Sequence, residues 1–188
     1  MASKFHLTTA DAIHLFFEDP NIFRAPPGNF GILYLLRRDI EQCLASKIQW
    51  PCAMAVMAGI DLLAKFFTGR DQSGDVGRRF QFFVKEYFHC TESEGRLIYQ
   101  LRNSLLHSFG LYFEDPLGTP RRFQLQAGVG KPLIEREDGG KYRVDLPTLH
   151  QRFESAVEKY RQDLFRHSTL ENNFAQMFSK YGCIPIEL

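Results

Sequence analysis

The sequence predicts a mainly α-helical bundle with a small β-hairpin insertion before its C-terminal helices. Apolar residues recur at helical spacing over most of residues 31–110 and again after residue 145. Between them, from about 111 to 145, short alternating segments are separated by proline and glycine, a pattern typical of short strands. The 188 residues, of which 44% are hydrophobic, suit one globular domain with a core. We therefore expect an irregular N-terminal leader over residues 1–30 and a single helical domain over residues 31–182.

The first elements follow from turn and capping signals. In the leader, Pro20 and the sequence Pro26-Pro27-Gly28 break any long helix. Apolar residues spaced three and four apart predict a helix over about 31–48. Pro51 suits the first turn of a second helix, and Gly69 is suited to end it.

Two further helices precede the insertion. A polar loop leads to a third helix that is expected to begin near Asp75. Thr91 and Glu94 have the spacing of a capping box, in which each residue hydrogen-bonds the backbone of the other. They predict the start of a fourth helix that runs to about Phe109 and ends at Gly110.

The insertion is expected to hold two or three strands. The sequence Asp138-Gly139-Gly140 favours a hairpin turn within it. After the insertion, Asp145 and Pro147 predict the start of a helix, and a shorter helix over about 169–181 ends at Gly182. The short alternating segments are residues 111–113, 122–126, 133–135 and 141–144.

Composition excludes some classes of function. The 23 Lys and Arg nearly cancel the 22 Asp and Glu, leaving a net charge of +1. A nucleic-acid coat protein held by bulk electrostatics is far more basic, so any nucleic-acid role requires a local site. No apolar run approaches the roughly 18–20 residues of a membrane-spanning helix, and the N-terminus lacks the apolar core of a signal peptide. We expect a cytoplasmic protein with no membrane association.

Neither a metal nor a cofactor is expected. The histidines are dispersed without metal-ligand spacing. The loop from Gly128 to Lys131 resembles a phosphate-binding loop, but Pro132 follows the lysine where Ser or Thr is needed. The cysteines form no Cys-x-x-Cys pair, which favours free thiols in a reducing compartment. They are Cys43, Cys52, Cys90 and Cys183.

Three basic pairs have two interpretations. Arg37-Arg38, Arg78-Arg79 and Arg121-Arg122 are each typical of a solvated helix or strand face. They would instead form a phosphate-tracking surface if the fold gathered them.

The most informative segment lies near the end of the fourth helix. At 100° per residue, Asn103 and His107 stack on nearly the opposite side from the core, with Arg102 on the flank. Tyr99 and Leu106 accompany them, which indicates a second contact surface. The alternative is a surface arginine, a capping asparagine and a histidine near a helix C-terminus, where positive charge is favourable. The core face consists of Leu97, Ile98, Leu101, Leu105 and Phe109.

The spacing of this motif is specific only in its tighter form. A loose Arg-x(4–6)-His pattern also matches Arg143 with His150 and Arg161 with His167. Requiring Asn directly after the Arg leaves only the segment from Arg102 to His107.

This segment, Arg102-Asn103-Ser-Leu-Leu-His107, resembles the motif of the HEPN superfamily (higher eukaryotes and prokaryotes nucleotide-binding domain). The stretch from Phe66 to Phe88 is also similar to small stand-alone prokaryotic members. The resemblance covers about residues 31–110, and the helix from 146 onward completes an HEPN-like bundle. The strand-rich insertion is a departure from the bare bundle.

The resemblance implies a function. Many HEPN proteins are metal-independent endoribonucleases, often of toxin–antitoxin or anti-phage systems, and act as dimers with the Arg and His of both chains facing a shared cleft. Only Arg102, Asn103 and His107 match the motif and inherit a role. Arg102 would hold a phosphate while its 2′-hydroxyl neighbour attacks, and His107 would move a proton. Asn103 would orient His107 or bind the phosphate.

Two alternatives remain open on the sequence. Other HEPN members have lost catalysis, so the chain is equally suited to be a non-catalytic module that binds a nucleotide, RNA or an antitoxin-like protein. It is also suited to be a structural dimerisation protein, in which Arg102 and His107 satisfy buried polar groups. The expected partners are a second copy of the chain in a homodimer, RNA or a nucleotide, and an antitoxin-like protein.

Overall fold

The computed structural model describes residues 7–18, 29–108, 110–114, 118–128 and 131–185 of the chain. Within these ranges the protein is mostly helical, which confirms the mainly α prediction. The helices are α1 (Thr9–Phe17), α2 (Ile32–Ala45), α3 (Gln49–Thr68), α4 (Val76–Tyr87), α5 (Glu92–His107), α6 (Leu146–Leu164) and α7 (Ser168–Tyr181), with short 3₁₀ turns η1 (Ser73–Asp75) and η2 (Asp138–Gly140). The strands are β1 (Asn29–Gly31), β2 (Tyr112–Glu114), β3 (Pro120–Gln126), β4 (Ile134–Glu137), β5 (Lys141–Asp145) and β6 (Cys183–Pro185).

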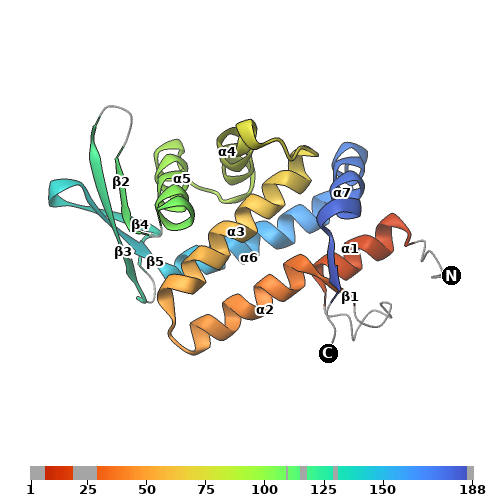
Figure 1. The fold of residues 1–188 in the computed structure, drawn as a ribbon, viewed down its shortest axis with the longest axis horizontal. Helices are drawn as coiled ribbons and strands as arrows, with labels where there is room; N and C mark the ends of the chain where they lie inside the picture. Colours follow the sequence, from red (N-terminus) through yellow and green to blue (C-terminus); the bar gives the residue numbers. More distant parts are fainter. Residues whose placement is uncertain (1–6, 19–28, 109, 115–117, 129–130, 186–188) are drawn as a thin grey trace.

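Helix α3 is the centre of the bundle. It packs against α2, α4, α5, α6 and α7 (Figure 1). Pro51 lies in its first turn and Gly69 ends it in the left-handed conformation with φ 64°, as predicted. The side chains of Val56, Ile60 and Leu63 are fully buried, so α3 supplies much of the core.

Helix α3 is the one described helix whose length and composition resemble those of a membrane-spanning helix. The helix has 20 residues and a mean hydropathy of 1.4, so by length and composition it is able to cross a membrane. The sequence showed no uninterrupted apolar run of that length because Asp61 and Lys65 interrupt it. Half of the apolar window is buried inside the protein, as in the core helix of a bundle.

Part of the expected irregular leader is a helix. Thr8 Oγ1 accepts a hydrogen bond from the Asp11 N–H at 3.2 Å, and Asp11 Oδ2 accepts one from the Thr8 N–H at 3.2 Å. This capping box begins α1. The ring of Phe16 is fully buried, 4.4 Å from the centroid of Phe66 and 5.4 Å from that of Phe174. The prediction of an irregular leader is wrong for α1, because the aromatic face of this helix packs against the core of the bundle.

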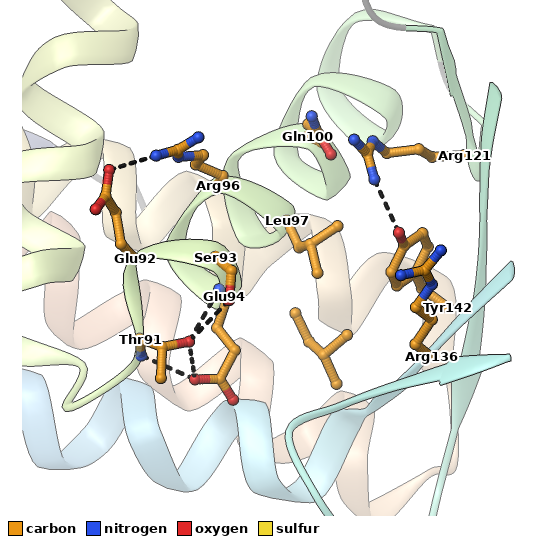
Figure 2. Close-up of a pocket in the computed structure, with 11 residues that line it drawn as sticks. Thr91, Glu92, Ser93, Glu94, Arg96, Leu97, Gln100, Arg121, Arg136 and Tyr142 are labelled. Carbon is orange, nitrogen blue, oxygen red and sulfur yellow. Dashed lines mark hydrogen bonds and ion pairs between the residues drawn. The ribbon is translucent and has the colours of Figure 1, made fainter. Parts of the chain in front are cut away.

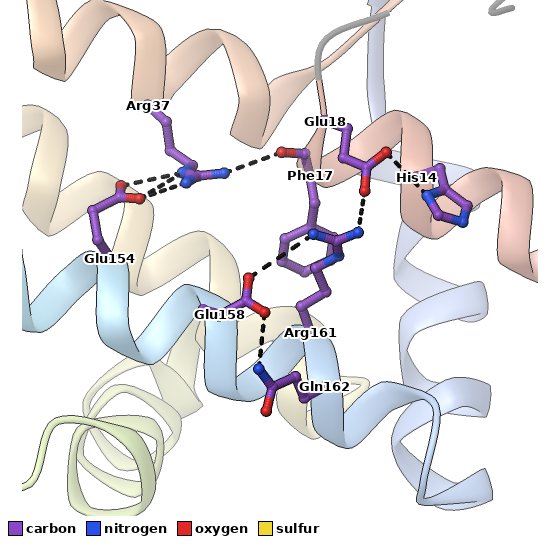
Figure 3. Close-up of polar contacts among 8 residues, drawn as sticks. All are labelled: His14, Phe17, Glu18, Arg37, Glu154, Glu158, Arg161 and Gln162. Atoms are coloured by element: carbon purple, nitrogen blue, oxygen red, sulfur yellow. Dashed lines mark hydrogen bonds and ion pairs between the residues drawn. The ribbon is translucent and has the colours of Figure 1, made fainter. Parts of the chain in front are cut away.

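Polar contacts also join α1 to the body of the bundle. Arg161 of α6 forms an ion pair with Glu18, directly after α1 (Figure 3). Arg37 of α2 pairs with Glu154 of α6 and donates to the carbonyl oxygen of Phe17 at 3.1 Å. The end of α1 is therefore held by both α2 and α6.

The segment around residue 30 pairs with the C-terminal part of the chain. Strand β1 is antiparallel to β6, with Phe30 opposite Ile184. The predicted domain limits of 31 and 182 fall at the last residue of β1 and just before the first residue of β6. The proline breaks predicted in the leader, Pro20 and Pro26-Pro27, lie outside the described residues.

The insertion is larger than the predicted hairpin. Its four strands form one sheet in the order β2-β3-β5-β4. The Asp138–Gly140 turn joins β4 to β5 as predicted, with Gly139 and Gly140 at φ 71° and 74°. A second antiparallel pair, β2 and β3, joins it through a parallel β3–β5 contact. Phe123 and Tyr142 face each other in that register with ring centroids 5.9 Å apart, and burial of these rings holds the two pairs together.

The sheet lies at one end of the bundle, beside α5 (Figure 1). Asp145 connects it to α6, because one carboxylate oxygen accepts the Thr148 N–H at 3.0 Å and caps the helix. The other oxygen accepts the Gly128 N–H at 2.9 Å. In the loop that resembles a phosphate-binding loop, the N–H of Gly128 therefore donates to a carboxylate of the chain itself. Residues 129 and 130 of that loop lie outside the described residues.

The remaining predicted helices are confirmed, with differences at their ends. Helix α2 ends at Ala45 rather than near 48, because a turn with a left-handed residue at Lys47 follows it. Helix α4 begins directly after Asp75, and α7 ends at Tyr181 before Gly182.

Candidate functional site

Helix α5 carries the predicted site, and its first turn is fixed by the predicted capping box. Thr91 Oγ1 accepts from the Glu94 N–H at 3.3 Å, and Glu94 Oε2 accepts from the Thr91 N–H at 2.8 Å. The helix ends at His107; the expected end at Phe109 falls outside the described residues. The cap sets where α5 begins, and therefore which side each residue of the motif occupies.

Arg102 is buried rather than on an exposed flank. Only 7% of the residue is exposed. Its Nε and Nη2 donate to Oδ2 of Asp61 at 2.8 and 2.5 Å. Asp61 lies in the middle of α3, and its side chain is 15% exposed. A guanidinium is costly to bury without a partner, and the carboxylate of Asp61 supplies one.

Arg102 also contacts both other residues of the motif. Its Nη1 donates to Oδ1 of Asn103 at 3.0 Å and bonds Nε2 of His107 at 2.5 Å. The structure therefore brings together the three residues that the motif singled out. His107 is exposed at the end of α5, and Asn103 is half-buried.

The contact between Arg102 and His107 has a defined donor and acceptor. A guanidinium has N–H donors and no acceptor, so Nε2 of His107 accepts this hydrogen bond through its lone pair. The tautomer that fits the contact is the one with its N–H on Nδ1.

Almost all hydrogen-bond donors of the Arg102 guanidinium have partners within the chain. Two of its N–H groups bond Asp61 and two bond Asn103 and His107, out of about five in any arginine. Asp61 Oδ1 is buried and accepts no hydrogen bond within the part of the chain that the structure describes. The result is a connected line of carboxylate, guanidinium and imidazole that runs from the interior to the surface.

Sequence reasoning missed Asp61. Its signal was a single acidic residue among apolar neighbours, between Ile60 and Leu62 on a helix that is otherwise suited to the core. A charge at such a position needs a partner of opposite sign. Which arginine supplies it depends on how α3 and α5 pack.

The predicted second contact surface is partly used within the chain. The Tyr99 ring lies 5.5 Å from the ring of Phe80 on α4, and Leu106 packs against the core. Both residues are half-buried. Asn103 and His107 therefore form the more accessible part of that surface.

The other matches to the loose Arg-x(4–6)-His pattern differ from this site. Arg143 forms an ion pair with Glu137, and Arg161 forms one with Glu18. Among the described residues, only Arg102 hydrogen-bonds the histidine of its own match. The added requirement for Asn after the Arg thus selects the one match in which the Arg and His side chains are hydrogen-bonded to each other.

The structure does not gather the three basic pairs into one phosphate-tracking surface. Arg37 and Arg38 lie on α2 and pair with carboxylates. Arg79 on α4 is 3% exposed and donates to a backbone carbonyl oxygen. Arg121 lies on β3, and α5 lies between this sheet and α4 (Figure 1).

Residues that could hold a metal do not cluster within the described ranges, where no three His, Cys, Asp or Glu side chains come together. The four cysteines are unpaired. Burial raises the pKa of Cys52 to about 11 and that of Cys183 to about 11, so both thiols stay protonated near neutral pH. They are poor nucleophiles in that state.

Comparison of the chain with protein-family models, with curated proteins and with solved structures gives no match. The resemblance to HEPN proteins therefore depends on the motif and on the helices that carry it.

Proposed function

We propose that this protein is a metal-independent endoribonuclease of the HEPN type, which cleaves RNA at Arg102, Asn103 and His107. The observation that carries the proposal is the pair of hydrogen bonds from Arg102 Nη1 to Asn103 and to the exposed His107. A phosphate-binding group thus lies within bonding distance of a proton-transfer group that is exposed at the protein surface.

The neutral imidazole suits the first proton transfer. When a substrate phosphate oxygen takes the N–H of Arg102 Nη1, it displaces His107 and frees the Nε2 lone pair. Nε2 then accepts the proton of the RNA 2′-hydroxyl. The 2′-oxygen forms a bond to phosphorus, the bond from phosphorus to the 5′-oxygen breaks, and the products are a 2′,3′-cyclic phosphate and a 5′-hydroxyl. Arg102 stabilises the charge that develops on the phosphate oxygens.

Asp61 and Asn103 are positioning residues in this scheme. Asp61 fixes the guanidinium from the buried side through Nε and Nη2, which leaves Nη1 for Asn103 and His107. Asn103 holds Nη1 next to His107. Each chain supplies one imidazole, whereas the 5′-oxygen also needs a proton as it leaves. A homodimer that places two copies of the site across a two-fold axis supplies the second imidazole.

The test is cleavage of single-stranded RNA by purified protein in EDTA, with analysis of the product ends. We expect 2′,3′-cyclic phosphate and 5′-hydroxyl ends, and a loss of about 10²–10⁴-fold in rate for His107→Ala. His167→Ala is the matched control, because His167 is also exposed at a helix end and its side chain makes no capping hydrogen bond. Equal activity of the two variants at equal melting temperature would rule out the assigned site.

A second candidate is a non-catalytic HEPN-like module that binds RNA, a nucleotide or an antitoxin-like protein. The near-complete use of the Arg102 guanidinium favours it, because a phosphate must displace an existing bond to reach Nη1. Intact RNA after long incubation, together with measurable binding, would support this candidate over the nuclease. If Arg102→Ala lowers the melting temperature without changing RNA affinity or cleavage, the network is structural.

A further inference from the structure

A pocket of about 760 Å³ lies between α5 and the inserted sheet, away from the Arg102 network. Leu97 and Gln100 line it from α5, and Arg121, Arg136 and Tyr142 line it from the sheet (Figure 2). Its volume is within the range of about 300–1,000 Å³ that small-molecule sites occupy, so a nucleotide fits. A bare helical bundle would lack the sheet wall.

The sheet wall carries two arginines, Arg121 and Arg136. Arg121 Nη1 donates to the hydroxyl of Tyr142 at 2.8 Å, and its guanidinium lies 5.7 Å from the centre of that ring. This contact holds Arg121 at the pocket, as Figure 2 shows. Arg136 is exposed and forms no ion pair with any residue that the structure describes. Two guanidinium groups at one wall favour an anion, and above all a phosphate.

The two carboxylates of the lining are engaged with neighbours on α5. Glu92 pairs with Arg96 at 2.5 Å. Glu94 accepts the backbone N–H of Thr91 as part of the helix cap. Glu92 is thus balanced by Arg96, whereas Glu94 keeps its charge and is held at the cap of α5 by this hydrogen bond.

The helix wall offers contacts for a base. Gln100 Oε1 is buried and accepts no hydrogen bond from the described residues. Leu97 from α5 and Ile134 from β4 add apolar surface beside it. A nucleobase presents a flat apolar face that matches this surface, and its N–H donors would reach the Gln100 oxygen once the side-chain amide turns towards the pocket.

The pocket and His107 lie on the same side of α5. Arg96, Gln100, Asn103 and His107 follow at intervals of four, three and four residues, which places them along one helix face. Gln100 and His107 are about 10 Å apart along the helix axis at 1.5 Å per residue. A short oligonucleotide bound at His107 is long enough to reach the pocket.

We propose that this pocket is a subsite for the RNA strand, in which Arg121 and Arg136 bind a phosphate next to the cleaved one and the helix wall receives a base. The inference rests on the proposed function, since it assumes that RNA lies at His107. It assigns the inserted sheet a role in holding the substrate.

The test measures binding of a short fluorescein-labelled oligouridylate to protein that carries His107→Ala, so that cleavage does not interfere. Adding Arg136→Gln is expected to weaken binding about tenfold, as loss of one charged hydrogen-bonding group does. The slope of log affinity against log salt should fall in magnitude by about 0.7, the value for one phosphate contact to a single strand. Arg121→Gln should act in the same direction. Arg122→Gln is the matched control, because Arg122 is exposed and adjacent residues of a strand point to opposite faces.

The outcomes separate the two proposals. If Arg136→Gln binds RNA like Arg122→Gln, the subsite is wrong, whether or not the wild-type protein cleaves RNA. If Arg136→Gln weakens binding while the wild-type protein leaves RNA intact, the subsite stands and the nuclease is wrong. Uridine monophosphate that binds as tightly as the oligouridylate would overturn the assignment to a strand. In protein that cleaves, Arg136→Gln should raise KM and leave kcat nearly unchanged, because it acts on a part of the substrate that does not react.

Discussion

Helix α3 makes two kinds of buried contact little more than one turn apart. Near its C-terminal end, Phe66 packs on Phe16 and Phe174 in an aromatic cluster without a charge. In its middle, Asp61 pairs with Arg102 of α5. The first contact stabilises the bundle through burial of apolar area, which has no preferred direction. The second loses hydration of two charges, and its geometry sets where one guanidinium points.

The difference shows what each region contributes. A cluster of phenylalanines has no hydrogen-bond direction to satisfy, so a small shift that keeps the rings in contact changes the buried apolar area little. The ion pair tolerates none without losing hydrogen bonds, and it orients Arg102 Nη1 towards His107. Neighbouring segments of α3 thus have different roles: the segment around Phe66 stabilises the bundle, and Asp61 sets the geometry of the site.

The largest effect on stability is expected at the aromatic cluster. Phe66 is fully buried, and Phe66→Ala should lower the free energy of unfolding by about 3–5 kcal/mol, measured by urea denaturation. RNA cleavage per folded molecule should not change, because the Asp61–Arg102 pair is intact. A loss of cleavage at a temperature where the variant is fully folded would show that the aromatic cluster also determines the geometry of the site.

The ion pair between Asp61 and Arg102 should affect both the free energy of unfolding and RNA cleavage. Asp61→Ala leaves the buried guanidinium of Arg102 without its carboxylate, and the expected loss is about 3 kcal/mol of unfolding free energy. Cleavage should also fall in the folded fraction, because Arg102 is no longer held from the buried side. The decisive control is Asp61→Leu combined with Arg102→Leu, which should recover most of the stability and none of the cleavage. Recovery of cleavage in that double variant would show that the pair has no role at the site.

The helix caps should have the smallest effects and should separate the two regions. Thr8→Ala and Thr91→Ala each remove a capping hydrogen bond and should lower the free energy of unfolding by about 1 kcal/mol. Thr8 caps the helix that carries Phe16, so its loss should leave cleavage unchanged. Thr91 caps α5, and its loss should reduce cleavage slightly through fraying of the helix that carries the motif. Hydrogen exchange of the amides of α1 and α5 locates each effect.

These two caps also show how far local sequence signals extend. Thr91 with Glu94 was recognised as a capping box because a helical pattern follows it. Thr8 with Asp11 has the same geometry in the structure, but the segment after it is short and soon reaches Pro20. An isolated helix of this length is marginal in water, so only packing of Phe16 and its neighbours stabilises α1.

The insertion shows the same limit for strands. Alternation and the Asp138–Gly140 turn predict the β4–β5 hairpin, because antiparallel pairing across a tight turn is local. The parallel contact of β3 with β5 joins segments separated by the hairpin itself, and only burial of Phe123 and Tyr142 selects it. The pocket beside α5 depends on that contact and could not be expected from the pattern alone.

By itself, the sequence determined the helical repeat, the start of α5 and the spacing of Arg102, Asn103 and His107, because these depend on backbone geometry and neighbouring side chains. The tertiary structure decided that Arg102 is buried, that Asp61 is its partner and that Arg121 and Arg136 face Gln100 across a pocket. Those relations join residues far apart in the chain, and they depend on how apolar faces of helices and sheet pack together. Local periodicity carries no information on that packing, and so the carboxylate that orients the motif became visible only in the folded protein.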